Sequence, residues 1–274
     1  MRPPWRIWRW NLSLPFAAVK TMILCGGLGT RLREETEYRP KPLVEIGGRP
    51  ILWHIMKLYS HFGFSSFVLC LGYRGDMIRD YFLNYREMNS DVTVRLEHGR
   101  EEITYHDNIE EDEFEVTLAE TGQETMTGGR LKLASRHLDG GPFMATYGDG
   151  VGDVNIAELL EFHRSHGKLA TVTTVRPPSR FGVVEVKDDD AVEGFREKPR
   201  LDDWVSAGYF VFEPQVLDYL TPESVLEEEP LRGLAHEGQL AAYRHEGFWA
   251  PMDTYRDRMM LEKLYRESAP WVVW

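Results

Sequence analysis

A glycine-rich stretch near the amino terminus constrains the fold more than any other part of the chain. Residues 22–41 read MILCGGLGTRLREETEYRPK. A short apolar run ends at Leu24, and Gly26, Gly27 and Gly29 follow before a helix-like segment. Glycine lets the backbone approach a phosphate closely, and the amide groups of such a loop point at phosphate oxygens. The order of strand, glycine loop and helix therefore predicts a phosphate-binding turn in an α/β fold.

This loop differs from the two commonest phosphate motifs. Arg31 and Leu32 stand where G-x-G-x-x-G needs its third glycine, and no G-K-[ST] closes the loop. The basic pair Arg31 and Lys41 can instead neutralise a triphosphate. An NAD-binding oxidoreductase is disfavoured, because the third glycine is missing and the second expected strand ends at Leu71 and Gly72 without an acid.

Composition narrows the class of protein further. The 274 residues are 42% hydrophobic, which is enough for a sizeable core. The net charge of −12 argues against a nucleic-acid partner but allows a nucleotide in a locally basic cleft. No run of 18 apolar residues exists, so we expect no membrane span. Cys25 and Cys70 fall in expected buried strands without metal-type spacing, which predicts reduced core cysteines in a cytoplasmic protein.

The pattern along the chain predicts one α/β domain over residues 19–274. Residues 1–18 hold three arginines, three tryptophans and no acid, and we expect a disordered extension or a start-site artefact. Between residues 22 and 96, strand, helix, strand, helix and strand alternate as in half of a doubly wound sheet, with the third strand at 92–96. The acidic run 107–115 is expected to be a solvated loop, and His163 and His166 are expected to be exposed.

Two later turns carry candidate site residues. Thr125 to Arg130, in TMTGGR, suits the edge of a nucleobase, although Thr127 could simply cap a helix. Asp149 follows an expected buried strand at 142–147, and a carboxylate at the carboxyl end of a central strand faces the ligand crevice of an open sheet. It can hold Mg²⁺ there, or belong to a plain Asp-Gly turn.

The second half of the chain adds weaker signals. Glu197 and Lys198, in EKP, suit a sugar hydroxyl and a sugar phosphate, although each alone is more often a surface ion pair. Gly208 lies inside an expected strand, as where a ligand touches backbone. Asp253 stands where a helix N-cap is expected, which is the default interpretation. It could also complete a metal site with Asp149.

From about residue 19 to the end, several segments occur in a diagnostic order: GGLGTRL, RPKPLVEIGGRP, MTGGRLK, YGDG, RFGVVEV, EKP and GFWAPMDT. The chain resembles the sugar-1-phosphate nucleotidylyltransferases, and MTGGRLK with YGDG and FWAPMDT resembles their CTP-using glucose-1-phosphate cytidylyltransferase branch. The resemblance implies a Rossmann-like, open, mixed and mainly parallel sheet flanked by helices, of the nucleotide-diphospho-sugar transferase type, with a small C-terminal portion. It also implies conversion of CTP and glucose 1-phosphate to CDP-glucose and diphosphate with Mg²⁺, in a homo-oligomer that feeds CDP-sugar and O-antigen-type synthesis.

Carried over by position, the resemblance assigns roles to individual residues. The nucleotide-binding set is Leu24, Gly26, Gly27, Leu28, Gly29, Thr30, Arg31, Lys41, Thr125, Arg130 and Gly148. Of these, the catalytic pair is Arg31 and Lys41. The sugar-phosphate set is Gly182, Glu197, Lys198 and Gly208. The Mg²⁺ ligands are Asp149 and Asp253.

The sequence departs from the family pattern at two places. Cys25 replaces the usual alanine, and Ser206-Ala207-Gly208 replaces Asn-Gly-Gly, which puts the sugar contacts of that strand in doubt. Two alternatives stay open. One is a uridylyl- or thymidylyltransferase of the same fold, which the Thr125–Arg130 turn would distinguish because cytosine presents an amino donor. The other is a non-catalytic regulatory subunit, disfavoured because both basic residues and both aspartates are present.

Overall fold

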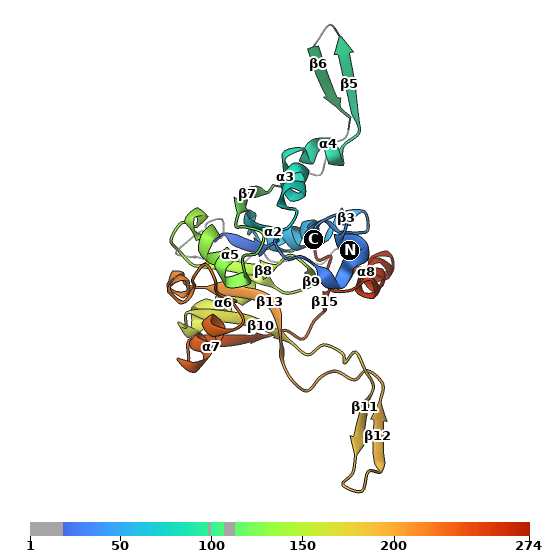
Figure 1. The fold of residues 1–274 in the computed structure, drawn as a ribbon, viewed down its shortest axis with the longest axis vertical. Coiled ribbons are helices and arrows are strands. Elements are labelled where there is room, and N and C mark those ends of the chain that lie inside the picture. Colours follow the sequence, from blue (N-terminus) through green and yellow to red (C-terminus); the bar gives the residue numbers. More distant parts are fainter. Residues whose placement is uncertain (1–18, 98–99, 107–112) are drawn as a thin grey trace, which may run out of the picture.

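A seven-stranded sheet forms the centre of the molecule (Figure 1). The computed structural model describes residues 19–97, 100–106 and 113–274. The strand order is β14-β10-β13-β8-β1-β4-β7. In chain order the strands are β1 (Thr21–Leu24), β4 (Ser66–Leu71), β7 (Glu115–Glu120), β8 (Phe143–Tyr147), β10 (Ala170–Val175), β13 (Val205–Phe212) and β14 (Leu240–Arg244).

The sheet is mixed and mainly parallel, as expected. Strand β1 lies between β4 and β8 and is parallel to both, while β4 is parallel to β7 and β10 is parallel to β14. Only β13 runs against its neighbours β8 and β10 among the described strands of this sheet. The carboxyl ends of β1, β4 and β8 therefore meet at one edge, where an open sheet binds its ligands.

Helices cover both faces of the sheet, so consecutive strand residues are apolar. In β1, Met22 and Leu24 belong to one core cluster and Ile23 to the other. The face of Ile23 packs under α2 (Ile51–His61), α3 (Gly75–Leu83), α6 (Ile156–His166) and α8 (Tyr255–Glu267). The opposite face packs under α5 (Thr127–Ala134), a 3-10 segment (Pro214–Tyr219) and α7 (Glu229–His236).

Short elements complete the described chain. The helical ones are the 3-10 turns Thr30–Leu32, Lys41–Leu43 and Ser135–His137, with α1 (Arg33–Thr36) and α4 (Tyr85–Asn89). The two-stranded sheets are β2 (Glu45–Ile46) with β3 (Arg49–Pro50), and β9 (Gly150–Gly152) with β15 (Trp249–Pro251). Two further pairs are β5 (Val92–Glu97) with β6 (Arg100–Tyr105), and β11 (Val183–Val186) with β12 (Val192–Arg196).

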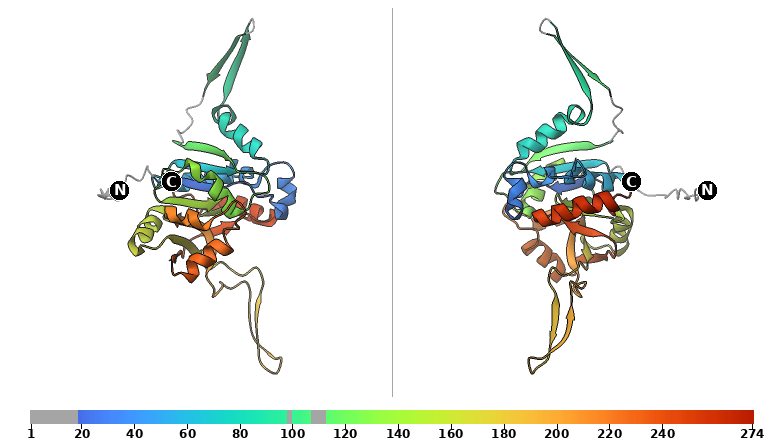
Figure 2. Two further views of the ribbon diagram at one scale, coloured as in Figure 1. Left: turned by 60° about the vertical axis from the view of Figure 1, so that its left-hand side comes forward. Right: turned by 90° about the vertical axis from the view of Figure 1, so that its right-hand side faces the viewer.

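The last two pairs are hairpins that project from opposite ends of the body (Figures 1 and 2). The prediction that residues 92–96 form the third sheet strand is therefore wrong, since β5 pairs with β6 and β7 takes that place in the sheet. Every residue of β5 is exposed. Its alternation of apolar and polar residues is typical of a ribbon with one apolar face, whereas a buried parallel strand is apolar throughout.

Burial also differs from expectation at one histidine. His163 is buried, and its Nδ1 lies 2.8 Å from Thr171 Oγ1, so the prediction that it is exposed is wrong. His166 is half-buried and reaches the same hydroxyl. Burial lowers the pKa of His163 to about 4. Both cysteines are buried and unbridged, as expected.

Two other expectations concern the limits of the described chain. Of the acidic run 107–115, residues 107–112 lie outside the described residues, and β7 already begins at residue 115. The extension 1–18 lies outside them as well. Within the part that is described, we find no helix of the length and apolarity that a bilayer crossing requires.

Candidate active site

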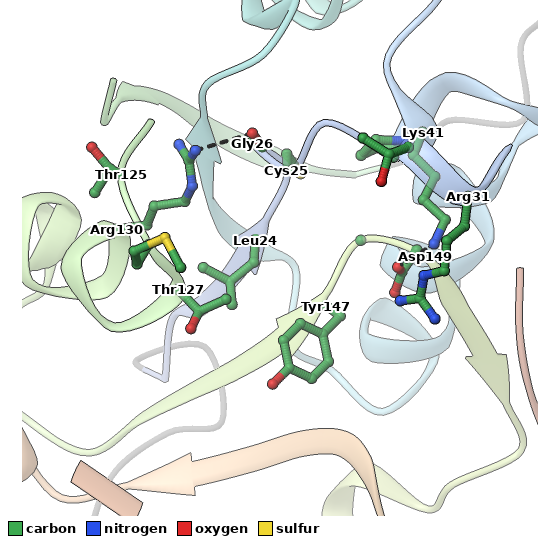
Figure 3. Close-up of a pocket in the computed structure, with 16 residues that line it drawn as sticks. Leu24, Cys25, Gly26, Arg31, Lys41, Thr125, Thr127, Arg130, Tyr147 and Asp149 are labelled. Atoms are coloured by element: carbon green, nitrogen blue, oxygen red, sulfur yellow. Dashed lines mark hydrogen bonds and ion pairs between the residues drawn. The ribbon is translucent and has the colours of Figure 1, made fainter. Parts of the chain in front are cut away.

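A cavity of about 340 Å³ opens where β1 and β8 end (Figure 3). The parallel register aligns Leu24 with Tyr147, so the loops that follow these two residues leave the sheet side by side. Eleven predicted site residues line the cavity: Leu24, Gly26, Gly27, Gly29, Thr30, Arg31, Lys41, Thr125, Arg130, Gly148 and Asp149. The structure thus brings together residues from four separate segments. Leu28 lies apart, with its exposed side chain beside Thr36 and Tyr73.

Two glycines of the loop are required by close contacts. Gly29 has φ of 62°, and a Cβ there would lie 2.6 Å from the Cγ2 atom of Thr36. Thr36 also fixes the turn, because its hydroxyl donates to the Gly29 carbonyl at 3.0 Å. A Cβ at Gly26 would lie 2.1 Å from the guanidinium carbon of Arg130. A larger residue at either position would displace the loop.

The end of the cavity that we call the phosphate end is ionic. Lys41 Nζ donates to Asp149 Oδ2 at 2.7 Å and to Asp253 Oδ1 at 2.8 Å. Arg31 Nη1 donates to the other oxygen of Asp253 at 3.1 Å. Figure 3 shows Arg31, Lys41 and Asp149 converging from separate elements. One ammonium therefore bridges two carboxylates that are far apart in sequence.

A small antiparallel sheet brings the two carboxylates together. Asp149 directly precedes β9, and Asp253 follows β15, its pairing partner. The amide of Met252 donates to the Asp149 carbonyl at 2.8 Å, which extends the pairing. At the far end, Asp153 Oδ1 accepts from the Phe248 amide at 2.7 Å. Backbone pairing, rather than the side chains alone, thus sets the spacing of the pair.

Asp253 does not cap the following helix, so the default interpretation of this residue is wrong. Thr254 is the N-cap of α8, and its hydroxyl accepts from the Asp257 amide at 3.2 Å. The Asp257 carboxylate in turn accepts from the amides of Asp253 and Thr254. This is a capping box, and it leaves the Asp253 carboxylate free to face Lys41.

The electrostatics of the phosphate end favour the charged forms. Burial opposes the charge of Lys41, but Asp149 and Asp253 outweigh it and raise the pKa of this lysine. Burial likewise opposes the charge of Asp253, but its hydrogen bond with Lys41 and the charges of Lys41, Arg31 and Arg180 lower its pKa. Both shifts favour the charged forms of Lys41 and Asp253, as expected for an ion pair.

The donor set at this end fits a divalent cation. Two carboxylate oxygens already converge on one positive centre, the Lys41 ammonium. Mg²⁺ is usually held by one or two carboxylates with substrate phosphates and water. Within the described residues no cluster of three or more potential ligand side chains occurs. A metal held by Asp149 and Asp253 would complete its coordination with phosphate oxygens and water.

The opposite end of the cavity, which we call the base end, is built from backbone around Arg130. This side chain is 4% exposed. Its guanidinium donates to Leu71 O, Thr121 Oγ1, Gly122 O, Gly26 O and Gln123 O at 2.7–3.1 Å. Burial lowers the pKa of Arg130. Arg130 therefore joins the loops after β1, β4 and β7, in addition to lining the cavity.

Gly128 and Gly129, which precede Arg130, allow α5 to pack closely against a neighbouring backbone segment. A Cβ at Gly129 would lie 2.0 Å from the Pro222 carbonyl oxygen. A Cβ at Gly128 would lie 2.8 Å from the Ser224 carbonyl oxygen. The first turn of α5 is thus pressed against the backbone of residues 222–224. Thr127 makes no cap for α5, because Met126 is the N-cap residue and has no side-chain cap bond.

Nothing in the sequence indicated Glu227, a carboxylate that links two residues of the base end. Glu227 accepts hydrogen bonds from the hydroxyls of Thr127, at 2.7 Å, and of Tyr147. Burial, with the nearby Glu227, raises the pKa of Tyr147. Tyr147, Thr127 and Met126 all line the cavity. Glu227 stands in the run EEEP, which carries no signal of a site.

The predicted sugar-phosphate residues do not line this cavity. Gly182, Glu197 and Lys198 lie at the base of the β11–β12 hairpin, and Lys198 pairs with Glu197 at 3.4 Å. Gly208 has φ of 80°, and a Cβ there would lie 2.2 Å from the ring of Tyr147. The packing of this ring explains the glycine without a ligand. The sugar-phosphate role of these residues stays a prediction.

One further arginine approaches the phosphate end. Arg180 Nη2 lies 3.8 Å from carboxylate oxygens of both Asp253 and Asp257. It belongs to the RFGVVEV segment, whose glycine alone had been assigned to the site. Arg180 stands two residues before Gly182, and a basic residue so close to a predicted site residue was the available signal.

Comparison with known proteins identifies the family. The sequence profile of the nucleotidyl transferase family matches residues 20–250. The glucose-1-phosphate cytidylyltransferase of Salmonella typhimurium is 47% identical over 260 residues, which cover 93% of this chain and all of the relative. A probable glucose-1-phosphate cytidylyltransferase of Bacillus subtilis is 40% identical over 259 residues, covering 93% and 100%. The chain belongs to the nucleotidyl transferase family.

A solved structure agrees on the fold. A putative glucose-1-phosphate thymidylyltransferase from Bacillus anthracis superposes with a TM-score of 0.65 at 18% identity, covering 91% of this chain and 96% of that one. At this identity the similarity concerns the fold alone. It supports the nucleotide-diphospho-sugar transferase architecture predicted from the sequence.

Proposed function

We propose that this protein is a glucose-1-phosphate cytidylyltransferase, which converts CTP and α-D-glucose 1-phosphate to CDP-glucose and diphosphate. The observation that carries the proposal is the convergence of Lys41, Asp149 and Asp253 beside the glycine loop. A family relative of that activity shares 47% of the sequence over its whole length. The cavity supplies one end suited to phosphates and another suited to a base.

The reaction requires that the two substrates be held in line and that the repulsion between their phosphate charges be offset. It does not require a nucleophilic side chain. A phosphate oxygen of glucose 1-phosphate attacks the α-phosphorus of CTP, and the bond from that phosphorus to the bridging oxygen breaks as diphosphate leaves. The attacking oxygen is already ionised near neutral pH, so no general base is required. Arg31 and Lys41 offset the charge of the two polyanions and hold them in line. When bound by Asp149 and Asp253, Mg²⁺ supplies Lewis-acid stabilisation of phosphate charge.

Base selection is assigned to the end around Thr125 and Arg130. Main-chain carbonyls of Gly26, Gly122 and Gln123 converge there on the Arg130 side chain. Each carbonyl oxygen can accept two hydrogen bonds, and the amino group of cytosine needs an acceptor where uracil and thymine present a carbonyl. Acceptor-rich backbone therefore supports CTP over UTP or dTTP. The uridylyl- and thymidylyltransferase alternatives predict no such preference.

Pyrophosphate release tests the proposal. The protein is assayed with glucose 1-phosphate and Mg²⁺, with CTP, UTP, dTTP, ATP or GTP in parallel. We expect turnover with CTP at least ten times that with each other nucleotide, on the scale of one or two base-edge hydrogen bonds. Equal use of UTP or dTTP would refute the cytidylyl assignment and retain the reaction type. Absence of turnover with all five would favour the regulatory subunit.

We also infer that the protein is a homo-oligomer. The β11–β12 hairpin exposes Phe181, Phe195 and Val192 to 78%, 64% and 63%, and the β5–β6 hairpin exposes Leu96 to 76%. An isolated two-stranded ribbon is at best marginally stable in water, so a covered hairpin is expected. Because Glu197 and Lys198 lie outside the cavity of their own chain, a second copy is the partner that would use them.

Mixing two inactive variants tests this arrangement. Lys198→Met removes the hairpin lysine, and Asp149→Asn alters the cavity carboxylate. If the hairpin serves the cavity of another copy, mixed oligomers contain intact sites and regain part of the activity that each variant lacks. If the mixed samples stay inactive, Lys198 does not serve the cavity of a second copy. A monomer in light-scattering measurements would refute the homo-oligomer itself.

We further propose a cytoplasmic location and a supply of CDP-glucose to CDP-sugar and O-antigen-type synthesis. Buried, unbridged Cys25 and Cys70 support a reducing compartment. Fractionation of the source cells tests the location. The protein is expected with the cytoplasmic fraction, and its recovery with periplasmic or membrane fractions would contradict this.

A further inference from the structure

The Lys41 ammonium occupies the position between the two carboxylates that would hold a divalent cation. Its nitrogen lies 2.7 Å from Asp149 and 2.8 Å from Asp253. The Lys41 side chain is 11% exposed, against 16% for Asp253 and 34% for Asp149. No ordinary surface ion pair has this geometry, since a single cation satisfies two part-buried anions at once.

We propose that Lys41 is a built-in counter-cation, which holds the divalent-metal position while no nucleotide is bound and transfers to the phosphates of CTP when the metal enters. The inference rests on the proposed function, because it takes Asp149 and Asp253 as the metal-binding pair. It assigns to Lys41 a role in the free protein that is separate from its role toward substrate.

Coulomb's law excludes simultaneous occupation of the position. A metal ion within bonding distance of both carboxylates would lie within a few ångströms of the present ammonium, and two positive centres repel strongly at such separations. Removing Lys41 without replacing its charge would leave two part-buried carboxylates facing each other, which is also unfavourable. Metal entry and departure of Lys41 are therefore linked.

The departing ammonium needs another anion, and the cavity provides the place for one. The lysine has a flexible four-carbon stem, and Lys41 lines the same cavity as Gly27, Gly29 and Arg31. A triphosphate there would accept the ammonium as the metal takes the carboxylates. Metal and nucleotide would thus bind cooperatively, and the coupling would be reciprocal.

The neighbouring arginines do not have this property. Arg31 and Arg180 contact Asp253 from the solvent side, with side chains 71% and 57% exposed. Both arginines pair with Asp253, whereas Asp149 pairs with Lys41, so neither arginine lies between the two carboxylates. Among the described residues, the ion pairs at this position therefore involve the cations Lys41, Arg31 and Arg180 and the carboxylates Asp149, Asp253 and Asp257, and Lys41 is the cation that bridges Asp149 and Asp253.

Manganese binding without nucleotide tests the proposal, using Mn²⁺ as the probe and electron paramagnetic resonance to count free ion. The samples are the full-length wild type, Lys41→Met and Lys41→Gln. Lys132→Met is the matched control, because Lys132 Nζ donates to the Leu217 carbonyl instead of a carboxylate. We expect both Lys41 variants to bind Mn²⁺ at least about tenfold more tightly than wild type and control, since one nearby positive charge is removed. Adding Asp149→Asn to Lys41→Met should abolish that gain.

Each outcome decides the proposal. Equal Mn²⁺ affinity in wild type and both Lys41 variants would overturn it, as would a gain that persists in the double variant. Thermal melting identifies a variant that fails to fold, and the neutral but hydrogen-bonding Gln then gives the answer if Met does not. Turnover of the wild type with CTP is measured separately. An active enzyme whose Lys41 variants show no tighter Mn²⁺ binding would keep the proposed function and lose this inference.

Discussion

The two ends of the cavity are built on different principles. At the phosphate end, Arg31, Lys41, Asp149 and Asp253 bring charged side chains from separate segments to one point. At the base end, backbone carbonyls converge on the buried Arg130. Side-chain charge thus dominates one end and main-chain geometry the other. Substitutions at the phosphate end should remove chemistry and spare the fold, whereas substitutions at the base end should affect both.

The largest effect is expected from Asp149→Ala. Loss of one of two convergent carboxylates should lower kcat by about 10³-fold or more, the scale of removing a preorganised electrostatic group. The melting temperature should change little, because the side chain borders the cavity rather than the core. Pyrophosphate release and thermal unfolding measure the two quantities. Asp139→Ala, at an exposed ion pair with Lys20, is the control. Retained activity with Mg²⁺ would remove Asp149 from the metal site.

Arg130→Met should have the opposite profile and destabilise the fold. It leaves the carbonyls of three loops without their shared donor, and we expect a loss of roughly 3–5 kcal/mol in the free energy of unfolding. Urea unfolding monitored by circular dichroism measures it. The exposed Arg136, whose guanidinium donates to His137 and Leu133 close by in the chain, provides the control variant Arg136→Met. A stable Arg130→Met protein that merely binds CTP weakly would show that this end resembles the phosphate end after all.

A smaller loss is expected from Gly129→Ala. The added Cβ would overlap the Pro222 carbonyl, and overpacking of this kind costs about 1–3 kcal/mol. Gly141→Ala serves as the control, because a Cβ at Gly141 meets no atom within 4 Å. Equal stability of both variants in urea would show that the contact between α5 and residues 222–224 relaxes freely.

The smallest expected effect is a loss of folding stability at acid pH. It arises from two buried histidines, His54 and His163, that belong to neither end of the cavity. Burial lowers the pKa of His54 and His163 to about 4, below the unfolded value of about 6.5. The unfolded chain binds more protons between these values, so stability falls as pH drops from about 6.5 to 4. Asp253 has a lowered pKa and keeps its charge over this range.

His163→Gln tests that assignment. At pH 5 this variant should lose roughly 1–2 kcal/mol less stability than wild type, relative to pH 7.5, because one titrating histidine is gone. Thermal unfolding at the two pH values measures the difference. An equal loss of stability at pH 5 in the variant and the wild type would show that His163 is not the group responsible.

The sequence predicted for a physical reason which residues meet at the phosphate end. Charged residues beside a glycine turn have few structural explanations, and Arg31, Lys41 and Asp149 do lie together. The central strands likewise followed from their short apolar runs, since β1, β4 and β8 are buried by helices on both faces. Their roles toward substrate stay predictions.

The contacts at the base end and the two hairpins could not be predicted from the sequence. Glu227 reaches Tyr147 and Thr127 only through the tertiary fold, and its local sequence resembles any acidic surface run. The sequence predicts a nucleotide role for Arg130, but two of its five protein acceptors, Leu71 O and Gly26 O, lie far from it in the chain and are brought to it only by the tertiary fold. Residues 92–96 alternate like an amphipathic sheet strand, and only the pairing partner decides that they form a hairpin.

The most direct test of the difference between the two ends is to measure the preference for CTP over UTP in a protein that lacks the Asp149 carboxylate. Equilibrium binding of CTP and UTP to Asp149→Asn and to wild type gives the ratio of the two affinities. Glucose 1-phosphate is left out, so that no reaction takes place and only recognition of the base is measured. We expect Asp149→Asn to keep the wild-type ratio of CTP to UTP affinity although turnover is lost. Disappearance of the preference together with the carboxylate would contradict the division of the cavity into two independently built ends.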